Sequence, residues 1–146
     1  MQIKELGHVV LYVSSLKRSA DFYKDTLGFA EIHRDAHTAL FSSGRTHHEL
    51  LLIEVGGPSG TQRFPSPGLY HIGFKIGDGA EAAKQAYTEL KEKGVQIVGT
   101  GDHGVTHSIY LLDPDGNELE LYADIGDEWK KNPKVVLTPV KGLDLG

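Results

Sequence analysis

The sequence predicts an α+β fold made of two βαβββ repeats. The evidence is a pattern that occurs twice: an apolar strand with a histidine near its start, a helix that ends at a glycine, and three short strands. His8 and His71 begin corresponding strands, and Gly28 and Gly94 end corresponding helices. The histidine and the glycine are 20 residues apart in the first repeat and 23 in the second, so the second helix region is longer by about one turn.

Residues 5–56 make up the first repeat. Its first strand, 6–13 (LGHVVLYV), is rich in β-branched residues, which is typical of a buried strand. Ser15 can cap a helix over 16–27, because its hydroxyl can accept a hydrogen bond from the first turn, and Gly28 ends that helix. Three further strands are predicted at 29–34, 38–43 and 48–55.

The second repeat, 69–124, follows a linker, 57–68, that is rich in Gly, Pro and Ser. Two such units side by side would place their curved sheets around a shared cleft. The last residues, 125–146, have weak periodicity and are expected to form an ordered tail over the cleft mouth or against a neighbouring subunit. The elements predicted in the second repeat are a helix at 80–93 and strands at 69–76, 95–98, 106–112 and 117–123.

The composition excludes several classes of protein. A length of 146 residues, 39% of them hydrophobic, fits one compact domain with a core. A net charge of −5 without a block of Lys or Arg argues against a nucleic-acid partner, and neither a membrane-spanning run nor a signal-peptide pattern is present. The absence of cysteine excludes disulfides and thiolate metal sites, and it suits a cytoplasmic protein. Eight histidines and twenty acidic residues leave imidazole and carboxylate as metal ligands, the donor set of Fe(II), Mn(II), Ni(II) and Zn(II).

The last predicted strand carries carboxylates in an unusual place. An Asp-Pro-Asp-Gly turn at 113–116 opens this strand, in which Glu118, Glu120 and Tyr122 share one face. An unpaired buried carboxylate is costly, so this face is either solvated or turned toward a cation.

His8, His71 and Glu120 are the candidate metal ligands. A single histidine in a strand is usually a core or surface residue, but here two histidines occupy the same point of two repeats. Two imidazoles and one carboxylate on one face form the ligand set typical of non-haem Fe(II) oxygenases. Such a set leaves open positions at which substrate and O₂ can both bind the metal.

The sequence resembles the vicinal oxygen chelate superfamily, which contains glyoxalase I, the fosfomycin and bleomycin resistance proteins and the extradiol dioxygenases. The resemblance lies in three motifs that cover residues 6–124: GHVVLYVSSLKRSADFYKDTLGF, LYHIGFKI and YLLDPDGNELELY. It implies two repeats whose curved mixed sheets enclose a metal-binding cleft, with the metal positions at His8, His71 and Glu120.

Three further residues resemble positions of the extradiol dioxygenase branch. His48, in THHEL, is similar to a distal acid/base histidine beside bound oxygen, and an imidazole can hold such a proton near neutral pH. His103, in DHGV, resembles a second histidine of the active site, and Tyr110 a tyrosine that hydrogen-bonds a metal-bound catecholate. The alternatives are that His47 and His48 are solvated turn residues and that Tyr110 is a core residue of its strand.

Glu54 favours a different branch. It lies 46 residues after His8, whereas Glu120 lies 49 after His71, and the difference equals that between the helix regions. Glu54 is therefore predicted to be the repeat counterpart of Glu120. In members that resemble glyoxalase I, a glutamate on this strand is a fourth metal ligand, which would suit an isomerase with Ni(II) or Zn(II).

Three functions follow as hypotheses. The first is an Fe(II)- or Mn(II)-dependent extradiol-type dioxygenase that cleaves a catechol-like aromatic substrate with O₂. The second is a glyoxalase I-like lyase or isomerase, in which Glu54 is the fourth ligand and the substrate is of the dicarbonyl type. The third is a metal-free binding protein of the bleomycin-resistance kind. The resemblance also implies a homodimer.

Overall fold

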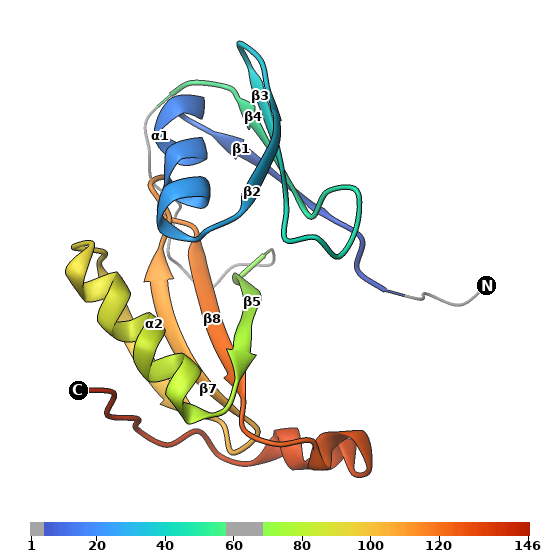
Figure 1. The fold of residues 1–146 in the computed structure, drawn as a ribbon, viewed down its shortest axis with the longest axis vertical. Coiled ribbons are helices and arrows are strands. Elements are labelled where there is room, and N and C mark those ends of the chain that lie inside the picture. Colours follow the sequence, from blue (N-terminus) through green and yellow to red (C-terminus); the bar gives the residue numbers. More distant parts are fainter. Residues whose placement is uncertain (1–4, 58–68) are drawn as a thin grey trace. The chain divides into compact units, whose positions relative to one another are not determined.

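A computed structural model of the chain describes residues 5–57 and 69–146 (Figure 1). The predicted linker lies outside the described residues, apart from Gly57. The described residues divide into two compact units, one from Met1–Gln62 with Pro114–Gly116 and the other from Arg63–Asp113 with Asn117–Gly146. Each unit contains a βαβββ module with a mixed four-stranded sheet, so the predicted α+β repeat fold is confirmed.

The sheet of the first unit has the strand order β1-β4-β3-β2. β1 and β4 are parallel, and the other neighbours are antiparallel. One face is buried by alternating apolar residues, because successive side chains of a strand point to opposite faces; Leu11 on β1 and Leu52 on β4 are examples. The strands are β1 (Val9–Val13), β2 (Ala30–Arg34), β3 (Thr38–Ser42) and β4 (Leu50–Glu54).

One helical segment covers the buried face of this sheet. It consists of α1 (Leu16–Asp21) and a π-helical turn, η1 (Phe22–Thr26), and so matches the predicted helix 16–27. Ser15 caps α1 by accepting a hydrogen bond from its first turn, and the segment buries Tyr23 completely. Gly28, with φ of 77°, ends it in the left-handed conformation that glycine adopts without strain.

The second unit repeats this architecture with the strand order β5-β8-β7-β6. β5 and β8 are parallel, and the two hairpin pairings are antiparallel. The helix α2 (Ala80–Glu92) packs on this sheet through Ala83 and Leu90, which are buried (Figure 1). The strands are β5 (His71–Asp78), β6 (Ile97–Asp102), β7 (Thr106–Leu112) and β8 (Glu118–Asp124).

The side chains of strand β8 alternate between the two faces of this sheet. Leu119 and Leu121 are buried on the side that α2 covers, whereas Glu118, Glu120 and Tyr122 are half-buried on the other side. We call this second side the Glu120 face. In the β5–β8 pairing, His71 lies opposite Glu118 and therefore on the same face as Glu120.

Three residues of the turn between β7 and β8, Pro114–Gly116, belong to the first unit. Asp115 of this turn is buried and accepts hydrogen bonds from the Ser14 amide at 3.1 Å, the Ser19 hydroxyl at 3.1 Å and Arg18 Nη2 at 3.0 Å. The Ser14 hydroxyl donates to the same carboxylate. The Asp-Pro-Asp-Gly turn is therefore anchored at the start of α1.

Two 3₁₀ turns and an extended segment make up the residues after β8. The turns are η2 (Glu128–Lys130) and η3 (Pro133–Leu137), and Lys141 then forms an isolated antiparallel bridge to Asp102 of β6. These residues belong to the second unit, and the position expected for them, over a cleft mouth or against a neighbouring subunit, stays a prediction.

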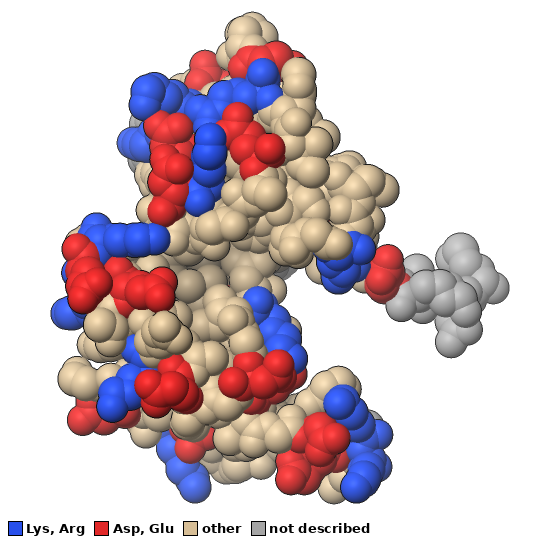
Figure 2. All heavy atoms as spheres, viewed as in Figure 1, with Lys and Arg blue, Asp and Glu red and all other residues tan. Residues whose placement is uncertain are grey.

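The surface carries mixed charge. On the face drawn in Figure 2, basic side chains of the described residues lie beside acidic ones. Ion pairs of this kind in the first unit include Lys17–Asp21 and Arg34–Glu31. Over residues 5–57 and 69–146, no helix has the length and apolar character needed to cross a membrane.

Candidate metal centre

His71 and Glu120 form the closest pair of metal-ligating side chains on the Glu120 face. His71 Nε2 lies 3.2 Å from Glu120 Oε2, and the two side chains are 28% and 16% exposed. The pair forms because parallel pairing of β5 and β8 aligns His71 with Glu118, two residues before Glu120. Imidazole and carboxylate are thus brought together with part of their surface still accessible.

Tyr110 and His103 extend this pair toward β6. The Tyr110 hydroxyl lies 3.3 Å from Glu120 Oε1, to which it donates, and 2.7 Å from His103 Nε2. Antiparallel pairing places Tyr110 directly opposite Glu120. Burial, followed by the nearby Glu120 carboxylate, raises the pKa of Tyr110 to about 12, so the phenol is protonated at neutral pH.

Glycines leave room beside these side chains. Gly73 is opposite Glu120 on β5, and Gly99 is opposite Tyr110 on β6, so both would direct a side chain onto the Glu120 face. A Cβ on Gly73 would lie 3.6 Å from Glu120 Oε2, and one on Gly99 would lie 3.8 Å from the Tyr110 ring. The glycines therefore add no side chain of their own beside the Glu120–Tyr110 pair, and the Tyr122 ring lies 3.5 Å from the Cβ position of Gly73.

The second ring nitrogen of His71, Nδ1, lies near Glu118, a residue to which the sequence analysis gave no role in the site. His71 Nδ1 is buried and makes no hydrogen bond within the described residues. The nearest carboxylate oxygen to it is Glu118 Oε1 at 3.8 Å, too far for a hydrogen bond but near enough for one after a small rotation. The even spacing between Glu118 and Glu120 already indicated a shared face, but only the strand pairing puts Glu118 opposite His71.

In the first unit, His8 and His48 lie together. His8 directly precedes β1 and is exposed, and its ring centroid is 4.6 Å from that of half-buried His48. His48 lies in the loop before β4 and not in the strand predicted to begin there; its Nδ1 is 2.5 Å from Nδ1 of His47. Desolvation, followed by the imidazoles of His47 and His8, lowers the pKa of His48 below its ordinary value.

Glu54 lies far along its strand from the level of His8. In the parallel pairing of β1 and β4, Glu54 is opposite Val13, whereas Val9, next to His8, is opposite Leu50. Glu54 is therefore about 16 Å along the sheet from the level of His8. Its Oε2 accepts a hydrogen bond of 2.6 Å from the Leu16 amide, which stabilises the start of α1. The prediction that Glu54 is the repeat counterpart of Glu120 is therefore wrong, and its role as a fourth ligand loses its basis.

The sheet register identifies Leu51 as the counterpart. Glu120 is opposite the residue two places after His71, and Leu51 is opposite Val10, two places after His8. The spacing argument failed because the segments after the helices also differ, with 23 residues from Gly28 to Leu51 and 26 from Gly94 to Glu120. At the repeat position of Glu120 the first unit thus has an aliphatic side chain, which cannot bind a metal.

The donors present suit a divalent transition metal. Two ligand atoms that are adjacent around one metal ion, each about 2.1 Å from it, lie about 3 Å from one another. The distance of 3.2 Å between His71 Nε2 and Glu120 Oε2 is close to this value. Hydrogen bonding of a ligand's second nitrogen to a carboxylate is usual in metal sites, and His71 Nδ1 faces Glu118. Within neither unit do the described residues group three His, Asp or Glu side chains for one ion. His71 and Glu120 on their own supply two donors, fewer than a metal site of three protein ligands needs.

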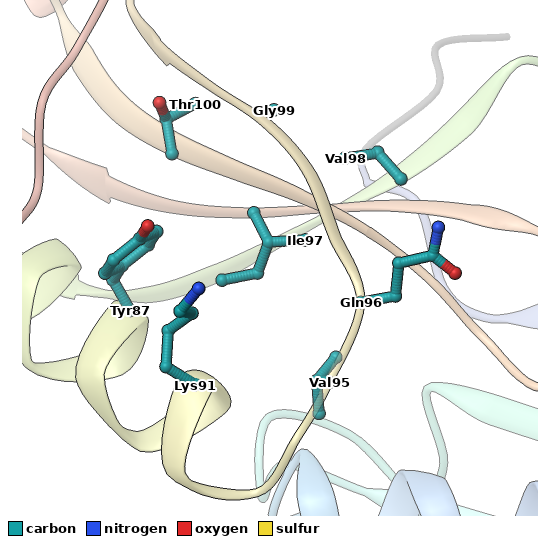
Figure 3. A pocket seen from close by; sticks show the side chains of 8 residues that line it. All are labelled: Tyr87, Lys91, Val95, Gln96, Ile97, Val98, Gly99 and Thr100. Atoms are coloured by element: carbon teal, nitrogen blue, oxygen red, sulfur yellow. The ribbon is translucent and has the colours of Figure 1, made fainter.

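A separate groove of ≈ 450 Å³ lies on the helix side of the second sheet. It is formed by the end of α2, the following loop and β6, with Tyr87 and Lys91 on one side and Ile97 on the other (Figure 3). None of the candidate ligands lines it. The groove is therefore distinct from the candidate metal centre, although Gly99 of β6 borders both.

A family model described as the Glyoxalase/Bleomycin resistance protein/Dioxygenase superfamily matches residues 5–121. The chain belongs to this superfamily. Among curated relatives, it is 37% identical over 122 residues to a catechol-2,3-dioxygenase of Bacillus subtilis and 31% identical over 120 residues to biphenyl-2,3-diol 1,2-dioxygenase 3 of Rhodococcus globerulus. Each match covers 82% of this chain but only 41% and 63% of the respective relative, so the chain spans about half the length of these dioxygenases.

Other superfamily members match over more of their own length. A lactoylglutathione lyase of Neisseria meningitidis is 28% identical over 125 residues, which cover 80% of this chain and 88% of the relative. Among solved structures, a glyoxalase/dioxygenase from Nostoc punctiforme has a TM-score of 0.66 at 22% identity and covers 84% of this chain and 92% of its own. This structural likeness supports the superfamily fold alone.

Proposed function

We propose that the chain is a metal-dependent extradiol-type dioxygenase that cleaves a catechol-like aromatic substrate with O₂. The main support is the set of contacts on the Glu120 face: His71 at one carboxylate oxygen, and Tyr110, held by His103, at the other. The set joins metal-ligating groups to a phenol donor at hydrogen-bond distance. The likeness to two named diol dioxygenases adds to this support.

His8, His71 and Glu120 would hold the metal, with Fe(II) as the expected ion and Mn(II) as the alternative. Two imidazoles and one carboxylate leave positions for substrate and O₂. When bound, Fe(II) supplies Lewis acidity toward two vicinal oxygens and electrons for O₂. Glu118 would accept a hydrogen bond from His71 Nδ1 and so leave Nε2 for the metal.

Tyr110 would orient the substrate. Its hydroxyl lies 3.3 Å from a proposed ligand oxygen, so a substrate oxygen beside the metal would be within its reach. A protonated phenol can donate to such an oxygen, and His103 fixes the direction of the hydroxyl through their 2.7 Å contact. This is positioning of a reactant by a preorganised donor.

His48 would hold the proton that the substrate loses. Its Nδ1 is engaged with His47, which leaves Nε2 as the nitrogen toward the substrate. The ring lies beside His8, the proposed ligand of the first unit. An imidazole at this place can accept a catechol proton and return it to the product.

The glyoxalase I-like alternative has less support. An isomerase of that kind would use a carboxylate from the first unit as a fourth ligand. The first unit has Leu51 at the repeat position of Glu120, and the Glu54 carboxylate binds the Leu16 amide. A metal held by His8, His71 and Glu120 alone would keep the open positions that a dioxygenase needs.

The test is oxygen uptake by protein purified without oxygen and loaded with Fe(II). We expect catechol-dependent oxygen consumption and a yellow ring-opened product with at least one member of a catechol panel. The Zn(II)-loaded protein should consume no oxygen. Binding of iron without oxygen uptake for any catechol would overturn the proposal, and His71→Ala should abolish uptake together with iron binding.

A further inference from the structure

The residues after η3 return to the outer edge of the second sheet. The Asp102 amide donates to Lys141 O at 3.0 Å, and the Lys141 amide donates to Asp102 O at 2.9 Å, as in a short antiparallel strand. The Thr100 hydroxyl donates to Leu143 O at 2.7 Å, and Leu145 is buried. The segment is thus fixed at several points, and it lies outside the residues 5–121 that match the family.

This edge segment directs one apolar side chain onto the Glu120 face. Gly101 is opposite Ser108 on that face, and a Cβ on Gly101 would lie 3.2 Å from Val140 Cγ1 and 3.3 Å from His103 Nε2. Val140 and His103 are therefore neighbours above the same glycine. Because side chains alternate along a strand, Lys141 points to the other face, beside Asp102.

The surroundings of Val140 have the character of a ring-binding surface. Val140 is 60% exposed, so its side chain is accessible to a bound molecule. Gly101 is buried beneath Val140 and His103, whereas Gly99 is half-buried and has the Tyr110 ring 3.8 Å from its Cβ position. A flat apolar group whose oxygens point toward Tyr110 can lie over Gly99 with its edge toward Val140.

We propose that Val140 of the C-terminal segment determines specificity by forming the apolar wall against which a ring substituent of the aromatic substrate packs. The inference rests on the proposed function, since it places the substrate oxygens at Tyr110 and Glu120. Apolar substituents are preferred because the side chain that the segment places above Gly101, beside His103, is aliphatic, while Lys141 points to the other side.

The experiment compares catechol with 4-tert-butylcatechol on the full chain and on variants at residue 140. Val140→Phe should weaken binding of 4-tert-butylcatechol at least about tenfold, whereas catechol affinity changes less than about threefold, because the added ring fills the space of the substituent. Val140→Ala should lower the preference for 4-tert-butylcatechol by about threefold to tenfold through lost apolar contact. Leu137→Ala is the matched control, because Leu137 is 77% exposed on the same tail.

Affinities are measured by calorimetric titration of Zn(II)-loaded protein, so that the readout does not depend on turnover. The far-UV circular dichroism and Tm of each variant establish that it is folded. Equal effects of Val140→Phe on both ligands, or no effect on either, would overturn the role of Val140 even when Fe(II)-loaded protein consumes oxygen. Failure of the unmodified protein to bind any catechol would overturn both this inference and the proposed function.

Discussion

The hydroxyl of Tyr110 lies between two partners, 2.7 Å from His103 Nε2 and 3.3 Å from Glu120 Oε1. The short contact to the imidazole fixes the direction of the phenol, and the longer one brings it to the carboxylate that we propose as a metal ligand. If His103 Nε2–H donates a hydrogen bond to the Tyr110 oxygen, the Tyr110 hydroxyl can donate its own proton to a different acceptor near Glu120. A substrate oxygen beside Glu120 would be such an acceptor.

Tyr110→Phe should therefore lower kcat/KM for the best catechol about tenfold to a hundredfold. The reason is the loss of one hydrogen bond to a charged oxygen, worth about 1.5–3 kcal/mol. Iron content should stay unchanged, because the ligands are intact. Steady-state oxygen uptake measures the effect, with Tyr87→Phe on α2 as the control. Equal kcat/KM in Tyr110→Phe and the unmodified protein would remove Tyr110 from the substrate site.

Glu118→Gln should weaken metal binding about tenfold to a hundredfold, as loss of a carboxylate behind a ligating histidine generally does. The cause is that His71 Nδ1 has Glu118 as its nearest carboxylate, at 3.8 Å. Competition with a chelator gives the Kd for Zn(II) or Mn(II) without any need for turnover. Glu89→Gln, on the exposed side of α2, should bind as the unmodified protein does. An unchanged Kd in Glu118→Gln would show that Glu118 does not orient His71.

The fold could be predicted from the sequence because the patterns that indicate its helices, strands and turns are local. Strand and helix periodicities, caps and turn residues all lie within a few positions, and they recur in both repeats. The limits of β6 were the main exception, since the predicted strand 95–98 extends instead over Ile97–Asp102. Gly99 and Gly101 made the second half of this strand hard to predict, because glycine usually weakens a strand and favours turns.

The site could be predicted only in part. Alternation along β8 correctly placed Glu118 and Glu120 on one face, since that pattern needs no knowledge of pairing. The counterpart of Glu120 in the first repeat depends instead on which residues of β1 and β4 face each other, and counting along the chain led to Glu54 rather than Leu51. The position of Val140 beside His103 depends on a long-range strand pairing that no local pattern indicates.

Leu51→Glu tests the repeat symmetry. If Leu51 occupies the position that corresponds to Glu120, a glutamate there should add a fourth donor and raise Zn(II) or Ni(II) affinity about tenfold or more, because ligand charge increases affinity. The same change should reduce catechol-dependent oxygen uptake, since it fills an open position. Leu51→Gln is the control, with similar size and no charge. If the two variants have the same metal affinity, residue 51 is remote from the metal.

Asp115→Asn tests the anchoring of the β7–β8 turn. An amide would place NH₂ hydrogens against the donors of Ser14, Ser19 or Arg18, which now all donate to the carboxylate. We expect the free energy of unfolding to fall by about 1.5–3 kcal/mol, the range for hydrogen bonds to a charged group. Urea denaturation measures it. Asp127→Asn, in an exposed turn, should change stability by less than about 0.5 kcal/mol, and an equal loss in both variants would contradict the anchoring role.

His48→Gln distinguishes a proton carrier from a ligand. The ring of His48 lies 4.6 Å from that of His8, so both roles are sterically open, but only His8 matches His71 in the repeat. A proton carrier predicts that kcat falls about a hundredfold, the lower end of general acid–base catalysis, while the Kd for metal stays within about twofold. His37→Gln, in the exposed turn between β2 and β3, should change neither quantity. Loss of metal from His48→Gln would instead place His48 among the ligands, and an unchanged kcat would remove it from the reaction.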